Sequence, residues 1–259
     1  MIPVSDSVKS RTTPYVNIAF IAFNILIFLY QLTLSTFPDP QAFLSELDLF
    51  FFDWGTIPAC LTERLGFEPE TDPRLLAGVC PEGERVLATP FTSMFLHGGW
   101  LHLIGNMVFL WVFGDNVEDA MGHARYAVFY LVVGLFAGAA HIFMNQNDFI
   151  PAIGASGAVA GVLGAYSVLY PRATVAAILP IFILFLFPFR VPAVLLIGFW
   201  FLLQLFNGIA AITSTDVTGA GGIAWFAHIG GFIAGVLLVR VFTIGRGRRG
   251  RLRLVPGAG

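Results

Sequence analysis

Long apolar segments dominate the pattern of hydrophobic and polar positions along this chain. Each is close to the ~20 residues that a helix needs to cross the hydrocarbon core of a bilayer. The pattern predicts six spanning helices, at residues 15–34, 101–117, 125–143, 154–170, 191–212 and 222–242. A seventh apolar stretch, 174–187, is shorter and contains Pro180, so we expect it to be interfacial or re-entrant and leave it uncounted.

The basic residues indicate how these helices are oriented, because lysine and arginine gather on the cytoplasmic side of membrane proteins. Lys9 and Arg11 precede the first span, and six arginines close or follow the last one, at positions 240, 246, 248, 249, 251 and 253. Both ends of the chain are therefore predicted to be cytoplasmic. Six crossings leave only Arg64, Arg74 and Arg85 in an outer loop.

The spans divide the chain into three parts. We expect a cytoplasmic N-terminal segment at 1–14, a membrane domain at 15–242 with an outer loop at 35–100, and an arginine-rich cytoplasmic tail at 243–259. The first span starts too late and is too long for a cleavable signal peptide, so we expect it to be retained. The outer loop holds the only two cysteines, Cys60 and Cys80, on the side where disulfides persist. A disulfide between them and a pair of buried free thiols both stay open.

Composition excludes several other classes of protein. Hydrophobic residues make up 57% of the chain and charged residues 12%, about half the ~25% of a soluble domain. A net charge of -2 gives no basic face for nucleic acid. No histidine stands near the cysteines at the spacing of a zinc site, so neither a metal nor another cofactor is predicted. The chain is predicted to be an all-α polytopic membrane protein with a six-helix bundle in the lipid bilayer.

Two polar side chains inside the apolar segments are predicted to meet. Ser156 begins the fourth helix, and His228 lies about 9 Å below the outer end of the sixth, so the two share a depth. Close approach of the two helices is favoured by small residues on both, namely Gly157, Gly161, Gly231 and Gly235. A hydroxyl within reach of an imidazole is the pairing that activates a serine nucleophile.

A second pair of polar residues lies near the outer end of the second helix. His102 and Asn106 are four residues apart and share a face. They could donate hydrogen bonds to an oxyanion together with backbone N–H groups at the start of the fourth helix, Gly154 included. Each polar residue also has a purely structural interpretation, since serine can bond a carbonyl one turn back and histidine can link helices.

Taken together, these residues resemble the rhomboid family of intramembrane serine proteases. The resemblance covers most of residues 90–240. Its motifs are HGGWLH at 97–102 with Asn106, then Gly114, Glu118 and Gly122, then GASG at 154–157, and AH at 227–228 with Gly231 and Gly235. The joint occurrence of these motifs, in this order and on six spans, carries the resemblance.

The resemblance implies a role for each matching position. Ser156 would be the nucleophile, His228 the general base, His102 and Asn106 would assist the oxyanion, and Glu118 would be structural. The implied activity is endopeptidase cleavage of transmembrane segments in membrane-protein substrates, near the outer face of the cell membrane and without a cofactor. No oligomeric state is predicted.

This chain departs from the family pattern at two places. Ala160 stands one turn after the serine, where rhomboids often have an aromatic residue against the histidine ring, so Trp225 or Phe226 is expected to support His228 instead. The family's Trp-Arg pair in the outer loop is not evident before His97. Two other interpretations stay open: a rhomboid-like protein that binds membrane proteins without cutting them, and a transporter, which would need broken helices and intramembrane charges.

Overall fold

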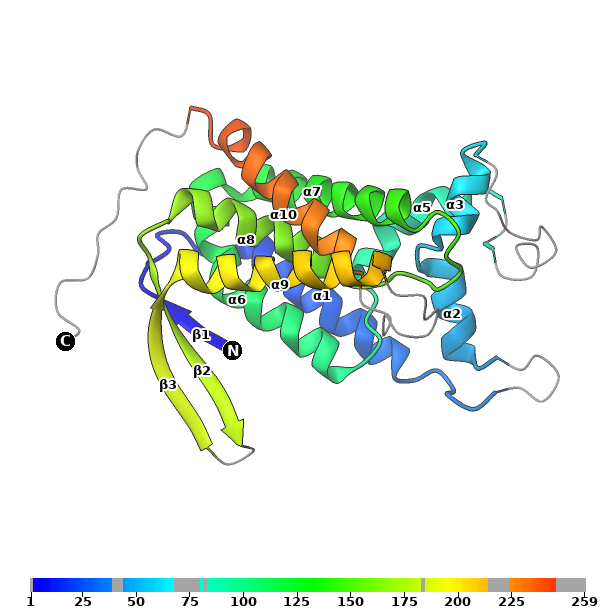
Figure 1. Ribbon diagram of the computed structural model, residues 1–259, viewed down its shortest axis with the longest axis horizontal. Helices are drawn as coiled ribbons and strands as arrows, with labels where there is room; N and C mark the ends of the chain where they lie inside the picture. Colours follow the sequence, from blue (N-terminus) through cyan, green and yellow to red (C-terminus); the bar gives the residue numbers. More distant parts are fainter. Residues whose placement is uncertain are drawn as a thin grey trace.

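The computed structural model describes residues 2–38, 44–67, 80–81, 83–182, 185–213 and 224–245. Long helices lie side by side in a bundle (Figure 1): α1 (Tyr15–Gln31), α6 (Trp100–Met121), α7 (His123–Met144), α8 (Ser156–Leu169), α9 (Ala193–Thr213) and α10 (Trp225–Phe242). Each of them coincides with one of the predicted spans. The predicted helical membrane fold is therefore confirmed.

Among the described residues, α7, α9 and α10 are individually long and apolar enough to cross a membrane. The segment Arg85–Phe95, made of α5 (Arg85–Thr92) and the 3-10 turn η1 (Ser93–Phe95), joins α6 at a bend of 75° and would give a fourth span if the bent pair counts as one. The apolar helices α1 and α8 are shorter, with 17 and 14 residues. Length and composition thus support three or four spans, and the count of six is approximate.

A buried carboxylate ties α1 to the turn between α6 and α7. Glu118 is fully buried and accepts hydrogen bonds from the backbone N–H groups of Val16 and Asn17, at 3.1 and 2.7 Å. Negative charge at a helix N-terminus stabilises N–H groups that have no partner within the helix. The same carboxylate binds His123 Nδ1 across the turn at Gly122, whose φ of 82° favours glycine. Glu118 therefore has the structural role expected from the sequence.

The described residues of the apolar stretch 174–187 lie in two β-strands rather than in a re-entrant helix. Strands β1 (Ile2–Asp6), β2 (Thr174–Phe182) and β3 (Phe185–Pro192) make an antiparallel sheet in the order β1-β2-β3. Figure 1 shows this sheet at the end of the bundle where α1 begins and α10 ends. Prolines at 180 and 188 oppose a helix, and the intervening β-branched and aromatic residues favour strands. The sheet adds a small β element to the otherwise helical fold.

The loop between α1 and α6 lies at the opposite end of the bundle (Figure 1). It contains α2 (Glu46–Trp54), α3 (Pro58–Arg64) and α5, and Cys60 and Cys80 are joined by a disulfide. Its small apolar core is built on Ile57, Cys60 and Val86. Thr56 and Ala152 exchange two backbone hydrogen bonds, of 3.1 and 2.8 Å. These bonds fix the loop to the segment that leads into α8.

Candidate functional site

Ser156 and His228 meet at the end of the bundle that carries the long loop. Ser156 is the first residue of α8, and His228 lies in the first turn of α10. The Oγ of Ser156 and the Nε2 of His228 are 2.8 Å apart. This is the distance at which a histidine can take the proton of a hydroxyl group. The structure thus brings together the two residues that the sequence places at one depth.

Glycines allow the backbones of α8 and α10 to touch below this pair. A Cβ atom added to Gly231 would lie 2.0 Å from the carbonyl oxygen of Gly157. A Cβ added to Gly235 would lie 2.0 Å from the carbonyl oxygen of Gly161. No larger residue fits at either position without moving a helix, so these glycines set the separation of Ser156 and His228.

Three side chains surround the imidazole of His228. Its Nδ1 lies 2.8 Å from the Oε1 of Gln204 on α9. The ring of Trp200 lies 5.8 Å from the imidazole, centroid to centroid, and that of Trp225 lies 6.3 Å away at nearly right angles. Trp225 is thus one of the two aromatic residues expected to replace the missing aromatic at position 160. Trp200 and Gln204 were not expected from the sequence.

His102 stands beside the loop that leads into Ser156. A Cβ atom on Gly154 would lie 2.6 Å from His102 Nε2 and 3.7 Å from Ser156 Oγ. Gly154 also has a φ of +127°, which a side chain would strain. The imidazole of His102 therefore packs directly on the backbone two residues before the serine.

Gly154, which the sequence predicts as an oxyanion donor, has a partner for its backbone N–H within the protein. Its backbone N–H already donates to the carbonyl oxygen of Ser93, at 2.8 Å. The N–H of Ser156 is different, because the first residue of a helix has no intrahelical acceptor for its N–H. The backbone donor nearest to the serine hydroxyl is thus that of Ser156 itself.

Asn106 lies one turn below His102 and binds a different histidine. Its Nδ2 is 3.1 Å from the Nε2 of His97. His97 is buried and packs edge-on against His102. Its backbone C=O accepts from the side-chain amide of Gln31, and its backbone N–H donates to the same amide. His102 thus faces Gly154, whereas Asn106 is held in a buried network with His97.

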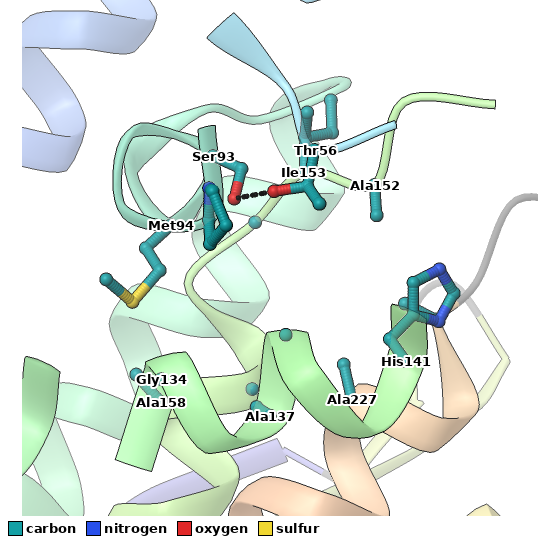
Figure 2. A pocket seen from close by; sticks show the side chains of 15 residues that line it. Thr56, Ser93, Met94, Gly134, Ala137, His141, Ala152, Ile153, Ala158 and Ala227 are labelled. Atoms are coloured by element: carbon teal, nitrogen blue, oxygen red, sulfur yellow. Dashed lines mark hydrogen bonds between the residues drawn. The ribbon is translucent and has the colours of Figure 1, made fainter. Parts of the chain in front are cut away.

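A small pocket lies near this end of the bundle, and Figure 2 shows the residues that line it. Gly157 and Ala227, the chain neighbours of Ser156 and His228, form part of its wall. Much of the remaining lining is small, and a hydrogen bond of 3.0 Å from Thr56 to Ser93 crosses its rim. His141 lies at the edge and binds the side chain of Asn145. Among the described residues, no cluster of histidine, cysteine and acidic side chains could hold a metal ion.

Comparison with known proteins gives the family. Residues 84–244, more than half of the chain, match the Rhomboid domain. The chain belongs to the rhomboid family. The matched region includes α6 to α10 and hence Ser156, His228, His102 and Gln204. The loop helices α2 and α3 and the strand β1 lie outside it.

Several curated relatives of this rhomboid come from plants and yeast. RHOMBOID-like protein 5 of Arabidopsis thaliana is 32% identical over 39% of this chain and 37% of its own length. Rhomboid protein 1, mitochondrial, of Saccharomyces cerevisiae is 30% identical over 56% of this chain and 39% of its own. Rhomboid-like protein 11, chloroplastic, of Arabidopsis thaliana is 29% identical over 57% of this chain and 50% of its own. The matches thus span half or less of these relatives.

Proposed function

We propose that this rhomboid is an intramembrane serine endopeptidase that cuts transmembrane segments of membrane proteins near the outer face of the bilayer. The observation that carries the proposal is the 2.8 Å contact between Ser156 Oγ and His228 Nε2. Family membership supports a protease-like activity. The distance between the two atoms is the one expected between a serine nucleophile and its general base.

In the proposed reaction, His228 Nε2 removes the hydroxyl proton as Ser156 Oγ attacks the carbonyl carbon of the scissile peptide bond. The protonated histidine then donates that proton to the departing amine, which leaves an acyl group on the serine. Water, deprotonated by His228, attacks this ester and releases the acid while the serine regains its proton. Both halves use the same two side chains, so no cofactor is needed.

The negative oxygen of the tetrahedral intermediate needs nearby hydrogen-bond donors. We assign this role to the backbone N–H of Ser156 and to His102, which packs two residues away on Gly154. The side-chain amide of Asn106 carries two N–H groups, and its contact with His97 uses no more than one of them. The other N–H can donate to the oxyanion from one turn deeper.

A substrate helix has its carbonyl groups bonded internally, so it must unwind locally before it can be cut. We therefore expect substrates with small or helix-breaking residues near the outer boundary of their membrane segment. The partners of this rhomboid are then the bilayer and single transmembrane helices within it.

We also propose that this rhomboid lies in the cell membrane with both ends of the chain in the cytoplasm. The start of α1 and the end of α10 lie at one end of the bundle (Figure 1), which requires an even number of crossings. Arginines at 240, 246, 248, 249, 251 and 253 mark that end as cytoplasmic. The long loop and Ser156 then face the outer side.

Labelling with a fluorophosphonate probe separates a protease from a rhomboid that binds without cutting. An activated serine attacks the phosphorus atom and expels fluoride, so the adduct is covalent and can be located by mass spectrometry. We expect an adduct on Ser156 in the purified protein, and none in His228→Ala of equal folded content. An unlabelled wild type that still captures transmembrane helices would support the non-catalytic alternative, and solute flux through reconstituted vesicles would support a transporter.

A further inference from the structure

The contact between a serine and a histidine does not by itself make the histidine a base. A hydroxyl group can donate a hydrogen bond or accept one, and a neutral imidazole carries its proton on either nitrogen. If Nε2 of His228 held the proton, it would donate to Ser156 and could not remove the hydroxyl hydrogen. The distance of 2.8 Å is compatible with both arrangements. A group on the far side of the ring must decide between them.

That group is Gln204, whose side chain is buried beneath His228. Its Nε2 donates to the backbone carbonyl of Trp200 at 3.1 Å, and its Oε1 lies 2.8 Å from His228 Nδ1. The opposite orientation of the amide would set its oxygen against the Trp200 carbonyl, where two acceptors would face each other. The oxygen therefore faces the imidazole, and an oxygen acceptor at Nδ1 requires a proton on that nitrogen.

Contacts between α9 and α10 fix the position of Gln204. Three residues before it, Phe201 stacks on Phe232 of α10 with ring centroids 4.2 Å apart. Four residues after it, Gly208 lies so close to α10 that an added Cβ would be 3.1 Å from Ile229 Cδ1. Residues three and four apart share a helix face. Gln204 thus stands between two packing contacts that hold its amide against His228.

From this geometry we propose that Gln204 is a positioning residue for the Ser156–His228 pair: its Oε1 holds the proton of His228 on Nδ1 and leaves Nε2 free to accept the proton of Ser156. The role matches that of the carboxylate in a Ser-His-Asp triad, filled here by a neutral amide. An amide orients the ring without adding charge to a bundle interior where charge is expensive. The inference deepens the proposed protease function and rests on it.

Two substitutions at Gln204 test the proposal in proteoliposomes with a fluorescent single-span substrate. Gln204→Met keeps the size of the side chain but removes the acceptor, so kcat should fall about 10- to 100-fold, the loss expected for one buried hydrogen bond in a critical position, with KM unchanged. Gln204→Glu restores an acceptor. Its carboxylate stabilises protonated His228, so activity should return at alkaline pH and the acidic limb of the profile should move upward by about one pH unit or more.

A matched control comes from Gln146, which is exposed and donates its Nε2 to the carbonyl of Phe143, one turn back. Gln146→Met makes the same chemical change away from the pair and should leave both kcat and the pH profile as in the wild type. Ser156→Ala and His228→Ala are measured alongside. If they retain cleavage, the protease proposal itself fails, independently of Gln204.

Two results would overturn the role of Gln204 while the protease proposal stands. One is a Gln204→Met variant that cuts at the wild-type rate throughout the pH range. The other is a Gln204→Glu variant whose activity changes only in proportion to its folded content, with no shift of the profile. Solid-state NMR of protein with nitrogen-15 in its histidines gives a readout that does not depend on turnover: Nδ1 of His228 should be protonated in the wild type, and Nε2 in a growing share of Gln204→Met.

Discussion

At the scale of single residues, Gly154 meets two demands that no other amino acid meets. Its φ is +127°, and a Cβ atom there would lie 2.6 Å from the Nε2 of His102. Its N–H is bonded to the carbonyl of Ser93, so the turn before Ser156 is fixed from both sides. Gly154 thereby fixes the placement of the serine and of His102.

Gly154→Ala should therefore reduce cleavage without unfolding the bundle. The added methyl group must displace His102 or the turn, and a shift of about 1 Å at a reacting group can cost on the order of 100-fold in rate. Initial rates of cleavage in proteoliposomes measure the effect. Gly99→Ala is a suitable control, because nothing lies within 4 Å of the Cβ it would add. Equal rates for the two variants would contradict this account of Gly154.

Buried polar residues show what could be predicted from the sequence at this scale. Ser156 and His228 stand out in apolar segments at one depth, and the structure pairs them. Gln204 is likewise a polar residue within an apolar segment, but its partner His228 could not be inferred from the sequence. The helix spacing gives the face on which a residue lies, whereas the hydrogen-bond partner depends on how three helices pack together.

At the scale of elements, the contact between α8 and α10 determines the separation of Ser156 and His228. Backbone meets backbone at Gly157 with Gly231 and at Gly161 with Gly235. In a bilayer, apolar side chains find equally apolar lipid, so close backbone packing replaces the hydrophobic effect as the source of helix association. The four glycines could be predicted as a packing surface because they recur at helical spacing on both segments.

Gly235→Ala should destabilise this helix pair. Its Cβ would lie 2.0 Å from the carbonyl oxygen of Gly161, so the helices must separate, at a cost of roughly 1–3 kcal/mol for an overpacked contact. Thermal unfolding in detergent micelles measures the loss. Gly105→Ala on α6, where nothing lies within 4 Å of an added Cβ, should be neutral or slightly stabilising. A Gly235→Ala protein as stable as Gly105→Ala would show that the contact is not as close as described.

The strand β1 ends in a carboxyl group that links the sheet to the bundle. Asp6 Oδ2 accepts hydrogen bonds from Tyr166 on α8 and from Asn116 on α6, the latter at 3.0 Å. Burial raises the pKa of Asp6 from 3.8 to about 6, an effect that its hydrogen bonds only partly offset. Asp115 lies in the same cluster. The folded protein therefore binds a proton at Asp6 more tightly than the unfolded chain does.

This linkage fixes the sign of a pH effect on stability. Between pH 3.8 and about 6 the folded state holds more protons at Asp6 than the unfolded state, so the free energy of unfolding should fall as pH rises through this window and level off above it. Asp6→Asn removes the titrating group, so the free energy of unfolding of this variant should depend less on pH in this window. Chemical unfolding in micelles from pH 4 to 8 measures it. An unchanged slope in Asp6→Asn would assign the effect to other groups.

The sheet itself could not be predicted from local pattern. The sequence pattern places residues 2–6 in the cytoplasmic segment before the first span. It places 174–187, which is short and contains Pro180, in an interfacial or re-entrant segment. Their pairing joins positions about 170 residues apart in the chain, as with Ile2 and Ile178. Hydrophobic periodicity describes neighbours in sequence and carries no information about such partners.

At the scale of the whole molecule, the two ends of the bundle carry different features. One end carries the sheet, the start of α1 and the end of α10 (Figure 1). The other carries the long loop, the Cys60–Cys80 disulfide and the Ser156–His228 pair. The bridge between Thr56 and Ala152 connects that loop to the segment before Ser156. The loop is therefore tied directly to the chain segment that leads into Ser156.

The measurement that tests the central claim most directly is cleavage of a fluorescent single-span substrate in proteoliposomes by the wild type, Ser156→Ala and His228→Ala. The account predicts that the wild type cuts within the outer part of the span and that both variants, equally folded, are inactive. Cleavage by either variant at the wild-type rate would contradict the assignment of the pair. The protease function would be contradicted if a folded wild type cut none of several such substrates and formed no fluorophosphonate adduct on Ser156.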